Sequence, residues 1–146
     1  MIRLKRIEEK DVTFVHGIED KCFNSIKRDD FIEHYVQNPL YEIELIEYNE
    51  VIIGYLVIWL DLDKSQLYSI YIRPDNRKQG MAFQALKLLE KKLLEQGIRE
   101  WTLEVRISNH SAINLYEKMG FQAIHIRKGY YANHEDALYM YKELRK

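Results

Sequence analysis

The chain contains few residues that cross-link the backbone or interrupt helices and strands. Its 146 residues include one cysteine, Cys22, and two prolines, Pro39 and Pro74. A lone cysteine cannot form an internal disulfide bond, which excludes a disulfide-stapled secreted fold. The prolines lie far apart, and Ser/Gly-rich runs, repeats and low-complexity segments are absent, so the composition marks no linker. We therefore expect residues 1–146 to form a single domain.

Excess charge and long apolar runs are also absent. A formal net charge of −1 provides no basic face for nucleic acid, so we expect no direct nucleic-acid partner. The longest apolar run, Val51 to Leu60, is interrupted by Gly54 and is too short to span a bilayer. The start, Met1 to Arg6, lacks the apolar segment of a secretion signal. These features predict a cytoplasmic protein without a membrane partner, and we expect a monomer or a weak homodimer.

Hydrophobic periodicity predicts the element order β-α-α-β-β-β-α-β-α-β-β. Strands are expected over residues 2–7, 41–45, 51–60, 67–73, 98–105, 121–126 and 137–144. Helices are expected after Asp11, around 31–38, over 80–96 and over 112–119. Ser108 or Asn109 is expected to cap the last helix, and Gly97 and Gly120 to end the last two. Hairpins followed by strand–helix–strand crossovers favour an α/β (α+β) fold, a mixed, mostly antiparallel sheet of about seven strands flanked by about four helices.

The junction between the strand ending near Ile72 and the long helix is suited to bind anions. Its sequence is Arg77-Lys78-Gln79-Gly80-Met81-Ala82. Small residues let the backbone approach a ligand, and the first N–H groups of a helix have no intrahelical partner. The helix dipole and the two cations also favour phosphate. A glycine that serves only the turn would explain this junction alone, but the residues downstream favour a pyrophosphate site.

Two residues downstream are candidates for acid–base chemistry. Glu104 lies in mid-strand on the face opposite Leu103, where glutamate is disfavoured, although a solvated face would also explain it. Tyr116 lies on the apolar stripe of the short helix, where a core tyrosine is the alternative. A base of this kind can deprotonate an amine of pKa about 8, and an acid of this kind can stabilise or protonate a thiolate leaving group of pKa about 8.5. With the anion site, the pair indicates direct acyl transfer from a thioester to an amine.

Five ordered blocks of sequence carry a family resemblance. They are Ile70-Tyr71-Ile72-Arg73-Pro74 with Arg77-x-x-Gly80-x-Ala82, Leu103-Glu104-Val105-Arg106-x-Ser108-Asn109, Ala112-x-x-Leu115-Tyr116-x-x-Met119-Gly120-Phe121, Ile126-Arg127-Lys128-x-Tyr130-Tyr131 and Glu135-Asp136-Ala137-Leu138. Through them the chain resembles the GNAT superfamily of acetyl-coenzyme A-dependent N-acetyltransferases. Within that superfamily it resembles the ribosomal-protein-alanine N-acetyltransferases.

The resemblance implies acetyl-coenzyme A as cosubstrate, no metal, and a role for each matching residue. It assigns Glu104 as general base and Tyr116 as general acid at the departing sulfur. Tyr130 and Tyr131 would grip the N-terminus of a protein acceptor. The cofactor's pantetheine arm and pyrophosphate would be bound by Ile70, Tyr71, Ile72, Arg77, Lys78, Gln79, Gly80, Met81, Ala82 and Asn109.

One segment departs from the family pattern. Relatives carry a Pro-Trp pair after the Cys-Phe position, whereas this chain reads Cys22-Phe23-Asn24-Ser25-Ile26-Lys27-Arg28. That loop lines the acceptor side in the family. The expected acceptor is the N-terminal alanine of a small-subunit ribosomal protein. A small amine such as a polyamine, amino acid or aminoglycoside, a broader protein N-terminal acetyltransferase activity, and a noncatalytic coenzyme A sensor remain alternatives.

Other reactive side chains give weaker signals. Cys22 lacks the partners of a thiol nucleophile and is expected to be a buried small residue. The histidines have no metal-ligand spacing, and the anion loop lacks the Gly-Lys-Ser/Thr ending of a nucleoside-triphosphate site. Four glutamates are expected on a solvated strand face and turn, with attraction of a cationic acceptor as the alternative: Glu42, Glu44, Glu47 and Glu50.

Overall fold

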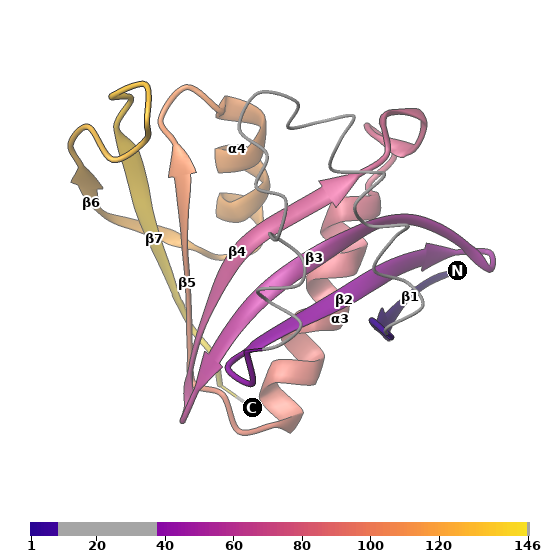
Figure 1. Cartoon of the computed structure of the whole chain (residues 1–146). Helices are drawn as coiled ribbons and strands as arrows, with labels where there is room; N and C mark the ends of the chain where they lie inside the picture. The colour runs from indigo at the N-terminus through magenta and orange to yellow at the C-terminus, as the bar shows by residue number, and fades with distance from the viewer. Residues whose placement is uncertain (9–37, 146) are drawn as a thin grey trace.

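The computed structural model describes residues 1–8 and 38–145. Its strands form one seven-stranded sheet in the order β1-β2-β3-β4-β5-β7-β6 (Figure 1). The strands are β1 (Ile2–Arg6), β2 (Tyr41–Tyr48), β3 (Val51–Asp61), β4 (Lys64–Ile72), β5 (Glu100–Arg106), β6 (Gln122–Arg127) and β7 (Ala137–Glu143). Neighbouring strands are antiparallel except β4 and β5, which are parallel. The predicted fold class and the mixed, mostly antiparallel sheet are confirmed.

Two α-helices lie in the described part of the chain, α3 (Met81–Glu95) and α4 (His110–Lys118). The apolar stripe of α3 is buried at Ala85, Leu86, Leu89 and Leu93. The helix ends at Gly97 (φ 81°), where the Gly97 and Ile98 amides donate to the carbonyls of Leu94 and Leu93. The helices expected within residues 11–38 lie outside the described residues. No described helix is long and apolar enough to cross a bilayer.

The central strands β2 and β3 are buried on both faces. On the α3 side, Ile46 and Leu56 belong to the main core with the helix residues. On the opposite side, Ile43, Leu45 and Val57 form a second buried cluster. The sequence predicted only one buried face for β2, because its alternate residues are glutamates.

Glu44 corrects the expectation of a solvated acidic face. Its residue is 1% exposed, and its carboxylate pairs with Lys92 of α3. Glu42 also pairs with Lys92, at 3.6 Å, and with Arg6, at 3.7 Å. A long lysine stem lets its ammonium reach a carboxylate on the buried face, and a buried carboxylate requires such a partner. These two glutamates therefore bind the sheet to α3 and do not form the solvated acidic face that was expected.

The strands β4 and β5 are paired only near their beginnings. The parallel ladder runs from Lys64–Glu100 to Leu67–Leu103 and then stops. Figure 1 shows the two strands spreading apart toward their arrowheads. Beyond the ladder, β4 continues to Ile72 and remains paired with β3 on its other edge. The separation leaves one edge of the Ile70–Ile72 backbone without a neighbouring strand in the described part of the chain.

Gly54 of β3 sits against the same part of β4, and its replacement by alanine should destabilise the sheet. A Cβ atom there would lie 1.9 Å from the Tyr71 carbonyl oxygen. Because backbone must move to relieve this overlap, we expect Gly54→Ala to lower the free energy of unfolding by about 3 kcal/mol, measured by urea denaturation.

Gly97→Asn is the matched control for Gly54→Ala. A Cβ at Gly97 meets nothing within 4 Å, and asparagine tolerates its left-handed backbone, so the loss should stay below about 1 kcal/mol. Equal stabilities of Gly54→Ala and the wild-type chain would contradict the close approach of β3 to β4.

Candidate active site

The anion loop folds as a tight turn that leaves the start of α3 uncapped. A 3-10 segment, Pro74–Asn76, follows β4, and the chain then passes through left-handed conformations at Lys78 (φ 62°) and Gly80 (φ 78°). Gly80 is the N-cap and offers no side chain to the helix, whose first backbone bond runs from the Gln84 amide to the Gly80 carbonyl. The preceding amides of α3 therefore remain available as donors to an anion.

All but one of the residues expected to bind a cofactor line one pocket of about 540 Å³. Its wall contains Arg77, which donates from Nε to the Ile72 carbonyl at 2.7 Å and lies 5.2 Å from the centre of the Tyr71 ring. Gln79 does not line the pocket, and its side-chain amide donates to the Asp75 backbone carbonyl at 3.1 Å. The other expected residues all line the pocket: Ile70, Tyr71, Ile72, Lys78, Gly80, Met81, Ala82 and Asn109.

The side chain of Asn109 caps α4, which decides between the two expected caps. Its Oδ1 accepts the Ala112 amide at 3.1 Å, and its side-chain NH₂ group is a donor available to a ligand in the pocket. Ser108 instead donates its backbone amide to Glu135 at 3.0 Å.

Tyr116 lies on the pocket wall and is held by the end of α4. The Phe121 and Gly120 amides donate to the carbonyls of Tyr116 and Glu117, with Gly120 at φ 101°. The Phe121 ring packs edge-on against Tyr116 at 5.9 Å. Among the described residues, the Tyr116 hydroxyl has no hydrogen-bond partner. Burial raises the pKa of Tyr116 to about 12, so the phenol keeps its proton at neutral pH.

Glu104 projects from β5 on the face opposite the core, as predicted, but it is not on a solvated surface. Its side chain is 10% exposed, and its Oε1 lies 3.5 Å from Arg127 Nε and 3.4 Å from Gln66 Nε2. Its Oε2 is buried and has no hydrogen-bond partner in the described residues. A buried, unpaired carboxylate oxygen is uncommon and marks a position where a ligand N–H could bind.

The loop between β6 and β7 brings Tyr130 and Tyr131 to this carboxylate. Their rings meet edge-on at 5.1 Å. Burial raises the pKa of Tyr130, and the nearby Glu104 carboxylate raises it further. Burial likewise raises the pKa of Tyr131, with opposing effects from Arg106 and Glu104. Tyr131 also acts on the pKa of Tyr116, which places it near both predicted catalytic residues. Tyr116 lines the cofactor pocket, whereas Glu104, Tyr130 and Tyr131 lie outside its lining.

Several residues of this region were not identified from the sequence. Phe83, Ser111, Leu115 and Lys118 line the pocket, and the last three lie on one face of α4 at i, i+4 and i+7. The partners of Glu104 had no local signal, because they come from other strands. Among the described residues, no group of three or more His, Cys, Asp and Glu side chains could hold a metal ion. The expectation of a metal-free reaction remains a prediction.

Comparisons with known proteins agree with this geometry. The model of the acetyltransferase (GNAT) family matches residues 5–121. The chain belongs to the GNAT family. A Bacillus subtilis (strain 168) protein, provisionally named a ribosomal protein bS18-alanine N-acetyltransferase, is 37% identical over 142 residues, covering 96% of this chain and 93% of that protein.

This GNAT chain is also similar in structure to solved acetyltransferases. The ribosomal-protein-S18-alanine N-acetyltransferase from Escherichia coli has a TM-score of 0.87 at 28% identity, covering 100% of this chain and 96% of that chain. The spermidine N-acetyltransferase from Vibrio cholerae in complex with CoA and spermine has a TM-score of 0.84. Its 16% identity, over 98% of this chain and 95% of that chain, shows the fold alone. The prediction of an N-acetyltransferase is confirmed, and GNAT acetyltransferases use acetyl-coenzyme A.

Gly80→Asn should weaken binding of acetyl-coenzyme A while the fold is retained. Asparagine tolerates a left-handed backbone, and a Cβ at Gly80 meets only the Gln84 side chain, at 3.9 Å. The added side chain would hinder contact between the phosphates and the α3 amides. Loss of one hydrogen bond to a charged group corresponds to roughly 10- to 100-fold in Kd, measured by calorimetry in magnesium-free buffer.

Gly97→Asn changes an equally left-handed glycine at the other end of α3 and should leave the Kd unchanged. Equal affinity of Gly80→Asn and wild type, or no binding to the wild-type chain at millimolar acetyl-coenzyme A, would contradict the assigned pocket.

Proposed function

We propose that the chain binds acetyl-coenzyme A in the pocket between β4, α3 and α4. Three features of the pocket support this fit. The uncapped amides at the start of α3, with Arg77 and Lys78, are suited to phosphates. The edge of Ile70–Ile72 that lies beyond the β4–β5 ladder offers backbone groups to the amides of a pantetheine arm, although the Ile72 carbonyl already accepts from Arg77. The side chains of Ala112 and Leu115 supply apolar contacts along the same wall.

Glu104 is proposed as the general base for the acceptor amine. Acetyl-coenzyme A would supply the acetyl group as a thioester. An acceptor ammonium must lose a proton before its nitrogen can attack, and the buried Glu104 Oε2 is an acceptor without a partner in the described residues. The Gln66 amide and the Arg127 guanidinium at Oε1 fix the orientation of the carboxylate.

Tyr116 is proposed to act on the leaving sulfur from the wall of the pocket, which it lines. Its hydroxyl keeps its proton at neutral pH, because burial raises its pKa to about 12. A thiol has a pKa of about 8.5, so a hydrogen bond from the neutral phenol is favoured over full transfer of its proton. This interaction stabilises negative charge on sulfur, which is a form of electrostatic catalysis.

The proposed acceptor is the N-terminal α-amine of a protein, most closely the alanine of a small-subunit ribosomal protein. The observation that carries this proposal is the position of Tyr130 and Tyr131 beside Glu104. Two rings meeting edge-on can hold the first residues of an extended chain with its amine at the base. The likeness to bS18-alanine N-acetyltransferases along almost the whole chain supports the same acceptor.

Glu104→Gln and Tyr116→Phe should lower kcat and leave acetyl-coenzyme A affinity nearly unchanged. Removing a general base typically costs about 10²- to 10⁴-fold, and removing one hydrogen-bond donor to a developing charge costs roughly 10²-fold. Steady-state kinetics and calorimetry measure the two quantities.

Glu100→Gln, on the same face of β5, and Tyr48→Phe, on β2, are controls that should retain wild-type kcat. Full activity of both Glu104→Gln and Tyr116→Phe would show that the assigned roles are wrong.

A panel of peptides and small amines, incubated with labelled acetyl-coenzyme A, tests the acceptor by mass spectrometry. We expect label on the α-amine of peptides that begin with alanine or serine. Tyr130→Ala and Tyr131→Ala should reduce this labelling, because each removes a ring beside Glu104. Label only on polyamines, amino acids or aminoglycosides would replace the proposed acceptor with a small amine.

A further inference from the structure

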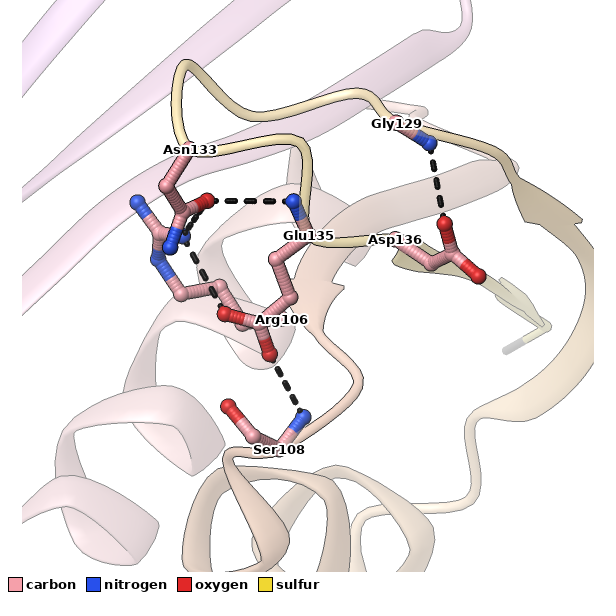
Figure 2. Close-up of polar contacts among 6 residues, drawn as sticks. All are labelled: Arg106, Ser108, Gly129, Asn133, Glu135 and Asp136. Carbon is pink, nitrogen blue, oxygen red and sulfur yellow. Dashed lines mark hydrogen bonds and ion pairs between the residues drawn. The ribbon is translucent and has the colours of Figure 1, made fainter.

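The loop that carries Tyr130 and Tyr131 is closed at its base by a polar contact. The Gly129 amide donates to Asp136 Oδ1 at 2.9 Å, and the Lys128 ammonium lies 3.3 Å from the other carboxylate oxygen. Figure 2 shows this contact at one end of the loop. It fixes the width of the loop but leaves the tyrosine rings to be held by other groups.

Arg106, near the end of β5, holds the other end of this loop. Its Nη1 donates to Asn133 Oδ1 at 3.0 Å and to Glu135 Oε1 at 3.3 Å (Figure 2). Its guanidinium carbon lies 4.0 Å from the centre of the Tyr131 ring. One cation therefore contacts the loop through two hydrogen bonds and one aromatic face.

Glu135 connects the same contacts to the start of α4. Its Oε2 accepts the Ser108 backbone amide at 3.0 Å, and its own amide donates to Asn133 Oδ1 at 3.1 Å. Hydrogen bonds from Ser108, and then the Arg106 guanidinium, hold the pKa of Glu135 below its usual range. The carboxylate is thus ionised at neutral pH, where Arg106 needs it as a partner.

We propose that Arg106 is a positioning residue for acceptor binding, which holds Tyr131 in place next to Glu104 and so fixes where the acceptor's N-terminus lies. The inference rests on the proposed function, in which Tyr130 and Tyr131 contact the acceptor. Arg106 comes from the strand that carries Glu104. The base and the support of the acceptor loop therefore share one rigid element.

The chemistry of these contacts requires arginine rather than any cation. A planar guanidinium can stack on an aromatic ring while its edge donates to oxygens, whereas a lysine ammonium is a point charge that cannot do both. Arg106→Lys keeps the charge but removes the ability to stack on the Tyr131 ring and donate to the loop oxygens at the same time. Arg106→Ala removes both, and Glu135→Gln weakens the hydrogen bonds while retaining the stacked pair.

We expect Arg106→Lys and Arg106→Ala to raise the acceptor KM by roughly 10- to 100-fold. Glu135→Gln should show a smaller rise. The kcat should fall less than the KM rises, because Glu104 and Tyr116 lie outside the loop. The Kd for acetyl-coenzyme A should not change. Arg99→Lys and Arg99→Ala, just before the opposite end of β5, are matched controls that should match the wild-type chain in every measurement.

Hydrogen exchange gives a readout that needs no acceptor. The amides of Tyr131 and His134 are bonded within the loop, to the carbonyls of Glu135 and Tyr131, so Arg106→Ala should accelerate exchange over residues 128–136. Failure of the proposed function would be seen in the wild-type chain as a lack of peptide acetylation. The acceptor KM would then be measured with the amine that the chain does acetylate.

Faster exchange in the loop together with a raised acceptor KM supports the positioning role. Faster exchange with an unchanged KM overturns it. A raised KM without faster exchange also overturns it, because Arg106 would then bind the acceptor directly. Wild-type exchange and wild-type KM in Arg106→Ala would show that these contacts do not hold the loop.

Discussion

The active site of this GNAT chain depends on how far β4 and β5 remain paired. Their parallel ladder ends at Leu67–Leu103, and a sheet paired along its full length would satisfy the Ile70–Ile72 backbone and close the pocket. Parallel neighbours require a crossover, which α3 supplies. The same crossover places the uncapped start of α3 at the mouth of the separation. A single topological feature thus gives both the strand edge and the uncapped helix start that are proposed to bind acetyl-coenzyme A.

Ion pairs that cross between layers hold the elements around this opening. Lys142 of β7 contacts Glu90 of α3 and the Met119 carbonyl at the end of α4. A cation at a helix C-terminus interacts favourably with the helix dipole and with carbonyls that lack intrahelical partners. Lys92 serves the other half of the sheet through Glu44. Partly buried ion pairs of this kind fix the positions of the helices relative to the sheet more than they add stability. Tyr116, which lies on α4, depends on that placement.

The acceptor is decided by groups outside the shared scaffold. Chains that acetylate a ribosomal protein and a polyamine superpose on this one with similar TM-scores, so the fold alone does not select the amine. In this chain the loop between β6 and β7 provides Tyr130 and Tyr131 beside Glu104. Its backbone is fixed by side chains from β5 and from its own base. These contacts hold the loop between β6 and β7, which is proposed to bind the acceptor.

The sequence by itself determined the strands, the stripe of α3, its end at Gly97, the anion loop and the anomalous Glu104, because each is a local pattern of period, turn residue or misplaced polarity. The burial of Glu44 and the partners of Glu104 were decided only by the tertiary structure. Alternation shows that two faces differ, but not that α3 will cover the acidic one with Lys92 in reach. Gln66 lies 38 residues from Glu104 in the chain, and their contact exists only because β4 and β5 are neighbours. Asn109, not Ser108, caps α4, and the Ser108 amide donates to Glu135, which lies in a distant loop.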